Sequence, residues 1–69
     1  MKVGEIWTRI EDNMDGKIAF IEWSEVYLED IVGMVDTWDY VNGEWNPSAV
    51  HILRPKFLKE HVKKPLIQL

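Results

Sequence analysis

The sequence predicts a small, mostly β domain, an antiparallel barrel of four or five strands with a short C-terminal helix. Three observations predict this fold class. Apolar residues alternate with a period of two in several short segments, Asp-Gly and Asn-Gly pairs stand beside those segments, and one stretch near the end has helical spacing. The chain has 69 residues and no cysteine, so we expect one domain, residues 1–69, without disulfides. Four tryptophans, two tyrosines and two phenylalanines then have to supply much of its core.

The first two strands are expected over residues 2–10 and 17–23. Residues 2–10 alternate β-branched and aromatic side chains, and residues 17–23 form a short apolar run of β-forming residues. Asp15 and Gly16 form a tight-turn pair between them, because glycine readily takes the positive φ that such turns need. Residues 23–33 have two interpretations: a helix with an apolar stripe that ends at Gly33, or an acidic loop between two strands.

An Asn-Gly hairpin is the clearest local feature of the chain. Residues 31–41 predict a strand, Asn42 and Gly43 follow at once, and the hairpin sets Tyr40 opposite Trp45 as a cross-strand aromatic pair. Pro47 predicts an irregular break, after which residues 49–53 resume an apolar, β-compatible run.

Residues 54–64 predict the helix. Pro55 fits a first helical turn, where its missing N–H is not needed, and Pro65 ends the pattern. The apolar face of this helix would carry His61, which we expect to be a packing residue, whereas His51 should point outward from a strand. The last four residues, LIQL, are apolar and fit an edge strand, a partner-binding segment or a frayed end.

Residues 11–22 also resemble the calcium loop of the EF-hand family. A glycine, Gly16, stands at the sixth position and an aliphatic residue, Ile18, at the eighth. The resemblance implies the ligands Glu11, Asn13, Asp15, Lys17 and Glu22. Against it, Gly4 would fall in the entering helix, the first ligand is a glutamate where aspartate is usual, and the chain offers no second loop to pair with. The hairpin is therefore the favoured interpretation, with no metal site.

Two segments resemble small Src-homology-like β-barrel proteins, many of which are encoded by bacteriophages. The opening KVGEIW is similar to their first strand, and PKFLKEHVKK is similar to their closing element. The resemblance implies a barrel fold and a small phage accessory protein, working in the host cytoplasm. The acidic insert at residues 22–30 departs from a minimal barrel.

The charge distribution and the hydropathy of the chain argue against nucleic acid and a membrane as partners. Residues 1–45 hold eleven acidic side chains against three basic ones, whereas residues 46–69 hold five basic side chains against one acidic. Because the acidic body repels phosphate, we do not expect nucleic-acid binding. No segment approaches the roughly 20 apolar residues that cross a bilayer, and no secretory leader is evident, so a cytoplasmic protein is expected.

The function expected from these features is that of a non-enzymatic protein-binding module. The chain has two histidines and no cysteine, and Ser24 and Ser48 lie in no nucleophile motif, so neither an enzyme nor a cofactor is expected. Exposed aromatic residues among carboxylates suit a protein contact. The predicted contact residues are Trp38, Tyr40, Trp45, Asp36, Asp39 and Glu44, unless these aromatics instead cap the end of the barrel. The partner would be another protein, such as a host enzyme that is bound or inhibited, and the chain a monomer or homodimer. The alternative function is calcium binding through residues 11–22.

Overall fold

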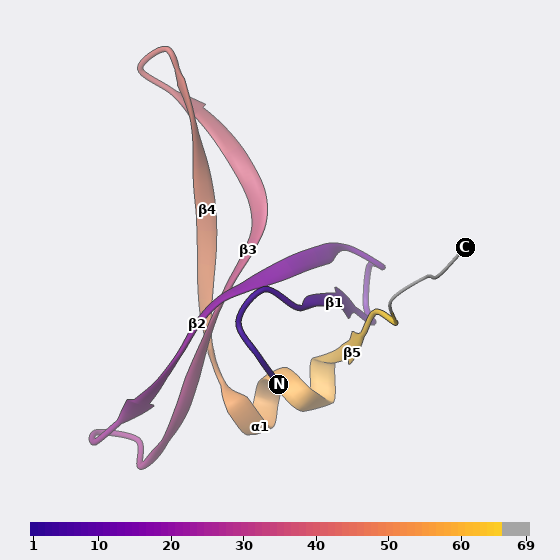
Figure 1. The fold of residues 1–69 in the computed structure, drawn as a ribbon, viewed down its shortest axis with the longest axis vertical. Coiled ribbons are helices and arrows are strands. Elements are labelled where there is room, and N and C mark those ends of the chain that lie inside the picture. The colour runs from indigo at the N-terminus through magenta and orange to yellow at the C-terminus, as the bar shows by residue number, and fades with distance from the viewer. Residues whose placement is uncertain (66–69) are drawn as a thin grey trace.

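A computed structural model confirms a mostly β fold, with one antiparallel five-stranded sheet and one short helix (Figure 1). It describes residues 1–65, and only the backbone of Thr37, Trp38, Asp39 and Trp45. The order of the strands in the sheet is β4-β3-β2-β1-β5. The elements, in chain order, are β1 (Ile6–Arg9), β2 (Asp15–Ser24), β3 (Glu29–Val41), β4 (Glu44–Leu53), α1 (Arg54–Glu60) and β5 (His61–Lys63).

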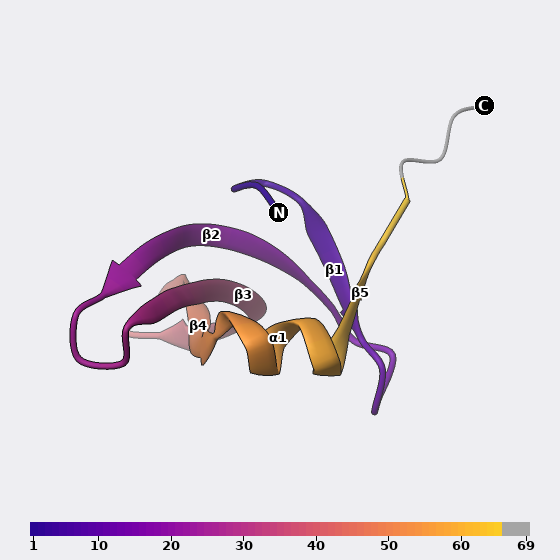
Figure 2. The same ribbon diagram turned by 90° about the horizontal axis from the view of Figure 1, so that it is seen from below.

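The sheet is open rather than closed into a barrel. Within residues 1–65, β4 and β5 form its two edges and do not pair with each other. Strand lengths give the reason: β3 and β4 have 13 and 10 residues, whereas β1 and β5 have four and three, so the long strands run past the short ones. Helix α1 connects the two edges, and the curved sheet arches over it (Figure 2). The expected antiparallel β fold is confirmed, and the expected closure is not.

The first hairpin forms, but its tip is not at Asp15 and Gly16. Both residues belong to β2, where they pair with Thr8 and Trp7. The chain reverses over residues 10–14 instead: the Arg9 N–H donates to the Met14 carbonyl at 2.8 Å, and Asn13 takes the positive φ of 61°. Gly16 is buried, and an added Cβ would lie 2.7–2.9 Å from the side chain of Met34. A glycine is needed at this position because a larger side chain would collide with Met34, and not because the backbone turns here.

The second connection is the acidic loop, not the helix. Ser24 and Glu29 are paired at the ends of β2 and β3, and residues 25–28 join them. The Ser24 hydroxyl accepts a hydrogen bond from the Tyr27 N–H at 3.3 Å, and Leu28 has a φ of 54°. Gly33 therefore caps no helix; it lies inside β3.

The Asn-Gly hairpin is confirmed in detail. Asn42 and Gly43 have φ values of 52° and 82°, as a type I′ turn requires, and Tyr40 stands opposite Trp45. The expected break at Pro47 is wrong, because β4 runs through it. An edge strand tolerates proline where its N–H would face away from the sheet. The irregularity lies on β3 instead, between Val35 and Thr37.

The helix starts as predicted, with Pro55 in its first turn, but ends four residues earlier. From His61 the chain is extended and pairs with β1, with His61 opposite Arg9 and Lys63 opposite Trp7. Strand β1 has a free edge on this side, and pairing with that edge displaces the last helical turn. The helix end is therefore decided by a tertiary contact, the pairing of residues 61–63 with β1, which helical spacing in the sequence does not reveal.

The core is small and lies between α1 and the middle of the sheet. Phe57 of α1 contacts the Trp7 ring edge-on, with centroids 5.1 Å apart, and stacks on His61 at 4.2 Å. His61 is only 2% exposed, which confirms it as a packing residue. Its Nδ1 lies 3.0 Å from the Phe57 carbonyl oxygen, whereas its Nε2 is buried without a hydrogen-bond partner among the described residues. His51 is exposed, as expected. The buried apolar residues are Trp7, Ile18, Val32, Met34 and Phe57.

Both hairpins of β3 project from this core (Figure 1). The radius of gyration is 13.1 Å, whereas a compact chain of this length has a value of about 11 Å. The excess agrees with two arms that extend beyond the packed centre: the β2–β3 hairpin and the longer β3–β4 ribbon.

Candidate functional site

The end of the β3–β4 ribbon holds most of the residues predicted to contact a partner. Tyr40 is 63% exposed, and Val41 and Glu44 are exposed beside it. The backbone places Trp45 opposite Tyr40, Trp38 opposite Pro47 and Asp39 opposite Asn46. Five of the six predicted residues are thus brought onto one short stretch of ribbon.

The sixth predicted residue, Asp36, lies apart from them. It stands at the β3 irregularity, is half-buried, and its carboxylate lies 3.7 Å from Nη1 of Arg9. Arg9 also donates to the Asp12 carboxylate, with Nε 2.8 Å from Oδ1, and this hydrogen bond raises the pKa of Arg9. Asp36 therefore belongs to an ion-pair network at the base of the ribbon, not to its exposed end.

The tip of the β2–β3 hairpin is a second exposed surface, and the sequence prediction missed it. Four large apolar side chains gather here within six positions, with exposed fractions from 60% to 85%. They are Trp23, Val26, Tyr27 and Leu28, which we call the loop patch. The sequence contained the information needed to predict this surface. If residues 23–33 form a loop and not a helix, their apolar side chains are not aligned on a helix face that packs on the core, so they are expected to be exposed.

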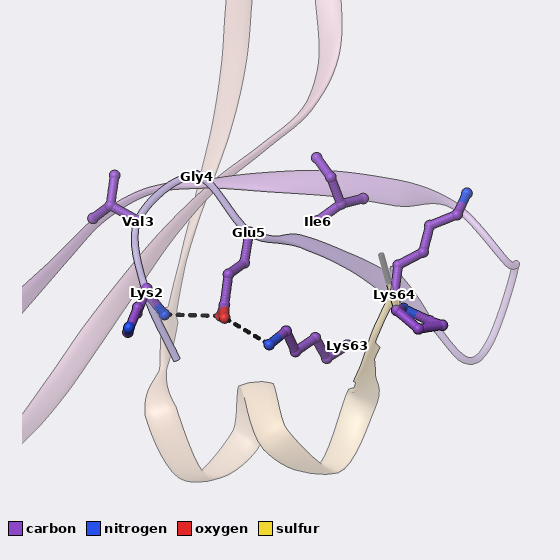
Figure 3. Close-up of a pocket in the computed structure, with 8 residues that line it drawn as sticks. Lys2, Val3, Gly4, Glu5, Ile6, Lys63 and Lys64 are labelled. Atoms are coloured by element: carbon purple, nitrogen blue, oxygen red, sulfur yellow. Dashed lines mark hydrogen bonds and ion pairs between the residues drawn. The ribbon is translucent and has the colours of Figure 1, made fainter. Parts of the chain in front are cut away.

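A cleft lies between the N-terminal segment and the end of β5 (Figure 3). Its volume is about 840 Å³, and Val3, Ile6 and Pro65 are among the residues that line it. The Glu5 carboxylate accepts the Lys2 N–H at 2.8 Å and the Trp7 indole N–H at 3.2 Å, and Lys63 Nζ lies 3.0 Å from it. The backbone N–H of Lys2, followed by Lys63, lowers the pKa of Glu5 to about 2.

Three charged side chains of this cleft, Glu5, Lys63 and Lys64, are engaged in ion pairs. A carboxyl group with a pKa near 2 is ionised at neutral pH and is a poor proton donor or acceptor for catalysis. Lys63 is engaged by Glu5, and Lys64 Nζ lies 2.7 Å from the Asp15 carboxylate. The described residues of the cleft thus form a structural ion network and do not assemble an acid–base pair.

The five residues of the calcium-loop alternative are not brought together. Glu11 and Asn13 lie in the first hairpin tip, whereas Asp15, Lys17 and Glu22 follow one another along β2. Seven residues of extended strand span roughly 23 Å, which separates Asp15 from Glu22 too far for one ion. Asp15 instead accepts the Thr8 hydroxyl at 2.6 Å and pairs with Lys64, and Lys64 followed by Thr8 lowers its pKa. No group of three or more His, Cys, Asp or Glu side chains among the described residues could hold a metal ion.

Comparisons of the chain with protein-family models, with curated proteins and with solved structures find no match. In the part of the chain that the structure describes, no helix has the length and apolar character to span a membrane.

Proposed function

We propose that this chain is a non-enzymatic protein-binding module that contacts its partner through the end of the β3–β4 ribbon. One observation carries the proposal: the ribbon extends beyond the core and holds an exposed tyrosine, Tyr40, opposite Trp45. Aromatic side chains dominate the binding free energy of protein interfaces. Glu44 lies beside them, and carboxylates of this kind steer a basic partner toward the contact.

The ribbon suits this role because the structure of its end depends on a tight turn and not on buried side chains. The type I′ turn at Asn42 and Gly43 fixes the register of the two strands, so the backbone keeps Tyr40 opposite Trp45. In this proposal Asp36 is a positioning residue. Its contact with Arg9 ties the base of the ribbon to β1, while Tyr40, Glu44 and the residues paired around them meet the partner.

The resemblance to small phage-encoded Src-homology-like proteins remains part of the proposal. A curved antiparallel sheet, an opening strand within KVGEIWTR and a short helix before the last strand support it. In this proposal the chain is a phage accessory protein that binds or inhibits a host protein in the host cytoplasm.

The test is an alanine series in the ribbon. The immobilised protein is used to isolate partners from a bacterial lysate, and the affinity of each purified candidate is then measured by calorimetry. We expect Tyr40→Ala to weaken binding roughly tenfold or more. Lys59→Ala, an exposed change on α1, is the matched control. Affinity that is unchanged across Tyr40→Ala, Glu44→Ala and Trp45→Ala contradicts the proposal.

The calcium alternative is tested separately with tryptophan fluorescence. Trp7 lies next to the first hairpin, opposite Gly16, so an ion bound there would change its emission. We expect no response at millimolar calcium, because β2 holds Asp15 and Glu22 apart. A saturable response that Glu22→Gln abolishes would establish the calcium site and displace the protein-binding proposal.

A further inference from the structure

The loop patch is unusual for so small a protein. Among the side chains that the structure describes, five apolar ones are buried, yet Trp23, Val26, Tyr27 and Leu28 stand in solvent at one hairpin tip. Single exposed apolar residues are normal, but four within six positions of one hairpin tip indicate an interaction surface. Its members are neighbours in sequence around one four-residue turn, so they lie together at the end of the arm.

Leu28 gives an independent sign that the patch is not there for stability. Its φ of 54° lies in the left-handed region, where bulky side chains are strained. The described chain has two other non-glycine residues at positive φ, Asn13 and Asn42, and asparagine is the residue type that tolerates this conformation. Leu28 is 69% exposed, so burial does not offset its strain. The turn would be better served by asparagine or glycine, and the leucine is explained if its side chain meets a partner.

Most of the charge around the patch is negative. Residues 18–53 contain no lysine or arginine. Glu22, Glu25 and Glu29 flank the patch and form no salt bridge with any side chain that the structure describes. Asp30 differs, because Arg54 Nη1 lies 3.1 Å from its carboxylate. An apolar centre with a carboxylate rim complements an apolar pocket with a basic rim.

We propose that the loop patch docks into an apolar pocket of a partner protein whose rim carries lysine or arginine. The inference concerns a different surface from the β3–β4 ribbon and does not depend on it. Two other occupants are disfavoured by the same charges. The acidic rim would be repelled by anionic lipid headgroups and by the loop patch of a second copy.

A displayed library of short random peptides is the probe that tests the proposal. The library is selected on the wild-type protein and, in parallel, on the double variant Trp23→Ser/Tyr27→Ser. Both side chains are exposed, so the fold should survive, and amide NMR shifts of core residues check this. We expect enriched peptides that combine apolar residues with a net positive charge. Their affinity should fall roughly tenfold or more in the double variant and weaken as salt is raised.

Two further variants isolate the patch. Val62→Ser removes an exposed apolar side chain from β5 and should leave the selected peptides bound as before. Leu28→Asn should raise the thermal midpoint of unfolding, because it relieves the backbone strain, and yet weaken the peptides. A purely structural Leu28 would give the opposite result, a lower midpoint with unchanged binding. Tyr40→Ala should also leave these peptides bound, which separates this proposal from the ribbon proposal.

The remaining outcomes overturn the inference. These are enrichment of the same peptides on the double variant, equal enrichment of acidic peptides, or no enrichment at all. Binding of the wild type to phosphatidylserine vesicles that the double variant lacks would assign the patch to a membrane surface. Sedimentation that shows concentration-dependent association, lost in the double variant, would assign it to a second copy of the chain.

Discussion

Strands β2 and β3 cross the middle of the molecule with Ile18, Val32 and Met34 fully buried, whereas the hairpins at their ends expose Trp23 and Tyr40. The contrast follows from the lengths of two elements. Strand β3 has 13 residues, or roughly 43 Å of chain measured along its curve, while α1 has seven and spans roughly 10 Å. One short helix shields only the centre of the sheet. Residues that hold the fold and residues available for contact are therefore separated along the same strands.

The largest expected effect lies at the centre. Phe57→Ala removes a fully buried ring that contacts both Trp7 and His61. We expect a loss of about 3–5 kcal/mol in the free energy of unfolding, enough to unfold most of a domain this small. Leu58→Ala, half-exposed on the same helix, is the control and should change stability by less than about 1 kcal/mol. Urea denaturation followed by circular dichroism measures both, and equal losses would show that α1 does not define the core.

A smaller loss of stability is expected from a change on the face of the sheet that points away from α1. A Cβ on Gly33 would lie 2.2–2.5 Å from ring carbons of Phe20, which lies over the glycine and contacts His51 edge-on at 5.1 Å. Gly33→Ala forces this ring away, and we expect a loss of about 1–3 kcal/mol.

A double-mutant cycle checks the cause of that loss. In a Phe20→Leu background the smaller side chain leaves room for the new methyl group, so Gly33→Ala should be less destabilising there than in the wild type. Additive losses in urea denaturation would mean that the clash is not the source of the effect.

The same contrast explains which parts of the fold could be predicted from the sequence. The Asn-Gly hairpin depends on two neighbouring residues with positive φ, and the helix start depends on Pro55, so local chemistry specifies both. The helix end at Glu60 could not be predicted, because it depends on the free edge of β1, which is distant in sequence. The open sheet likewise follows from strand lengths that the alternation pattern did not define.

One residue misled the prediction, and one spacing pattern left it undecided. Gly16 was assigned to a turn, but it makes room for Met34, and sequence does not separate these two uses of glycine. Trp23 and Tyr27 have the spacing of a helix face, and the same spacing occurs in an exposed loop. In the predicted site, Asp36 could not be separated from the aromatic residues because its partner, Arg9, lies on another strand.

The ion pair of Glu5 lies at the border between the core and the solvent, and the dependence of stability on pH tests its contribution. The pKa of Glu5 is lowered to about 2 from an ordinary value of 4.5 by the Lys2 N–H and Lys63. The ionised form therefore stabilises the folded state, fully so above pH 4.5, and this contribution disappears as the pH falls to about 2. Glu5→Gln should be less stable than wild type at neutral pH, by less than the core variants because the pair is solvent-screened. Denaturation midpoints should converge near pH 2, and a constant difference across this range would mean that charge is not the cause.

The smallest effect on global stability is expected at the end of the ribbon. Gly43 has a φ of 82° and open space around its Cα, so Gly43→Ala strains the backbone without a steric clash. The strain, about 1 kcal/mol, falls on a hairpin whose described side chains Tyr40 and Val41 are exposed. Because little burial links this end to Phe57, the chain can relieve the strain by opening the ribbon locally while the core stays folded. Amide hydrogen exchange should accelerate at residues 40–45 and stay unchanged at Ile18 and Val32, and the melting temperature should barely move. A drop in protection at both places would mean that ribbon and core unfold as one unit, and the separation between folding residues and contact residues would no longer hold.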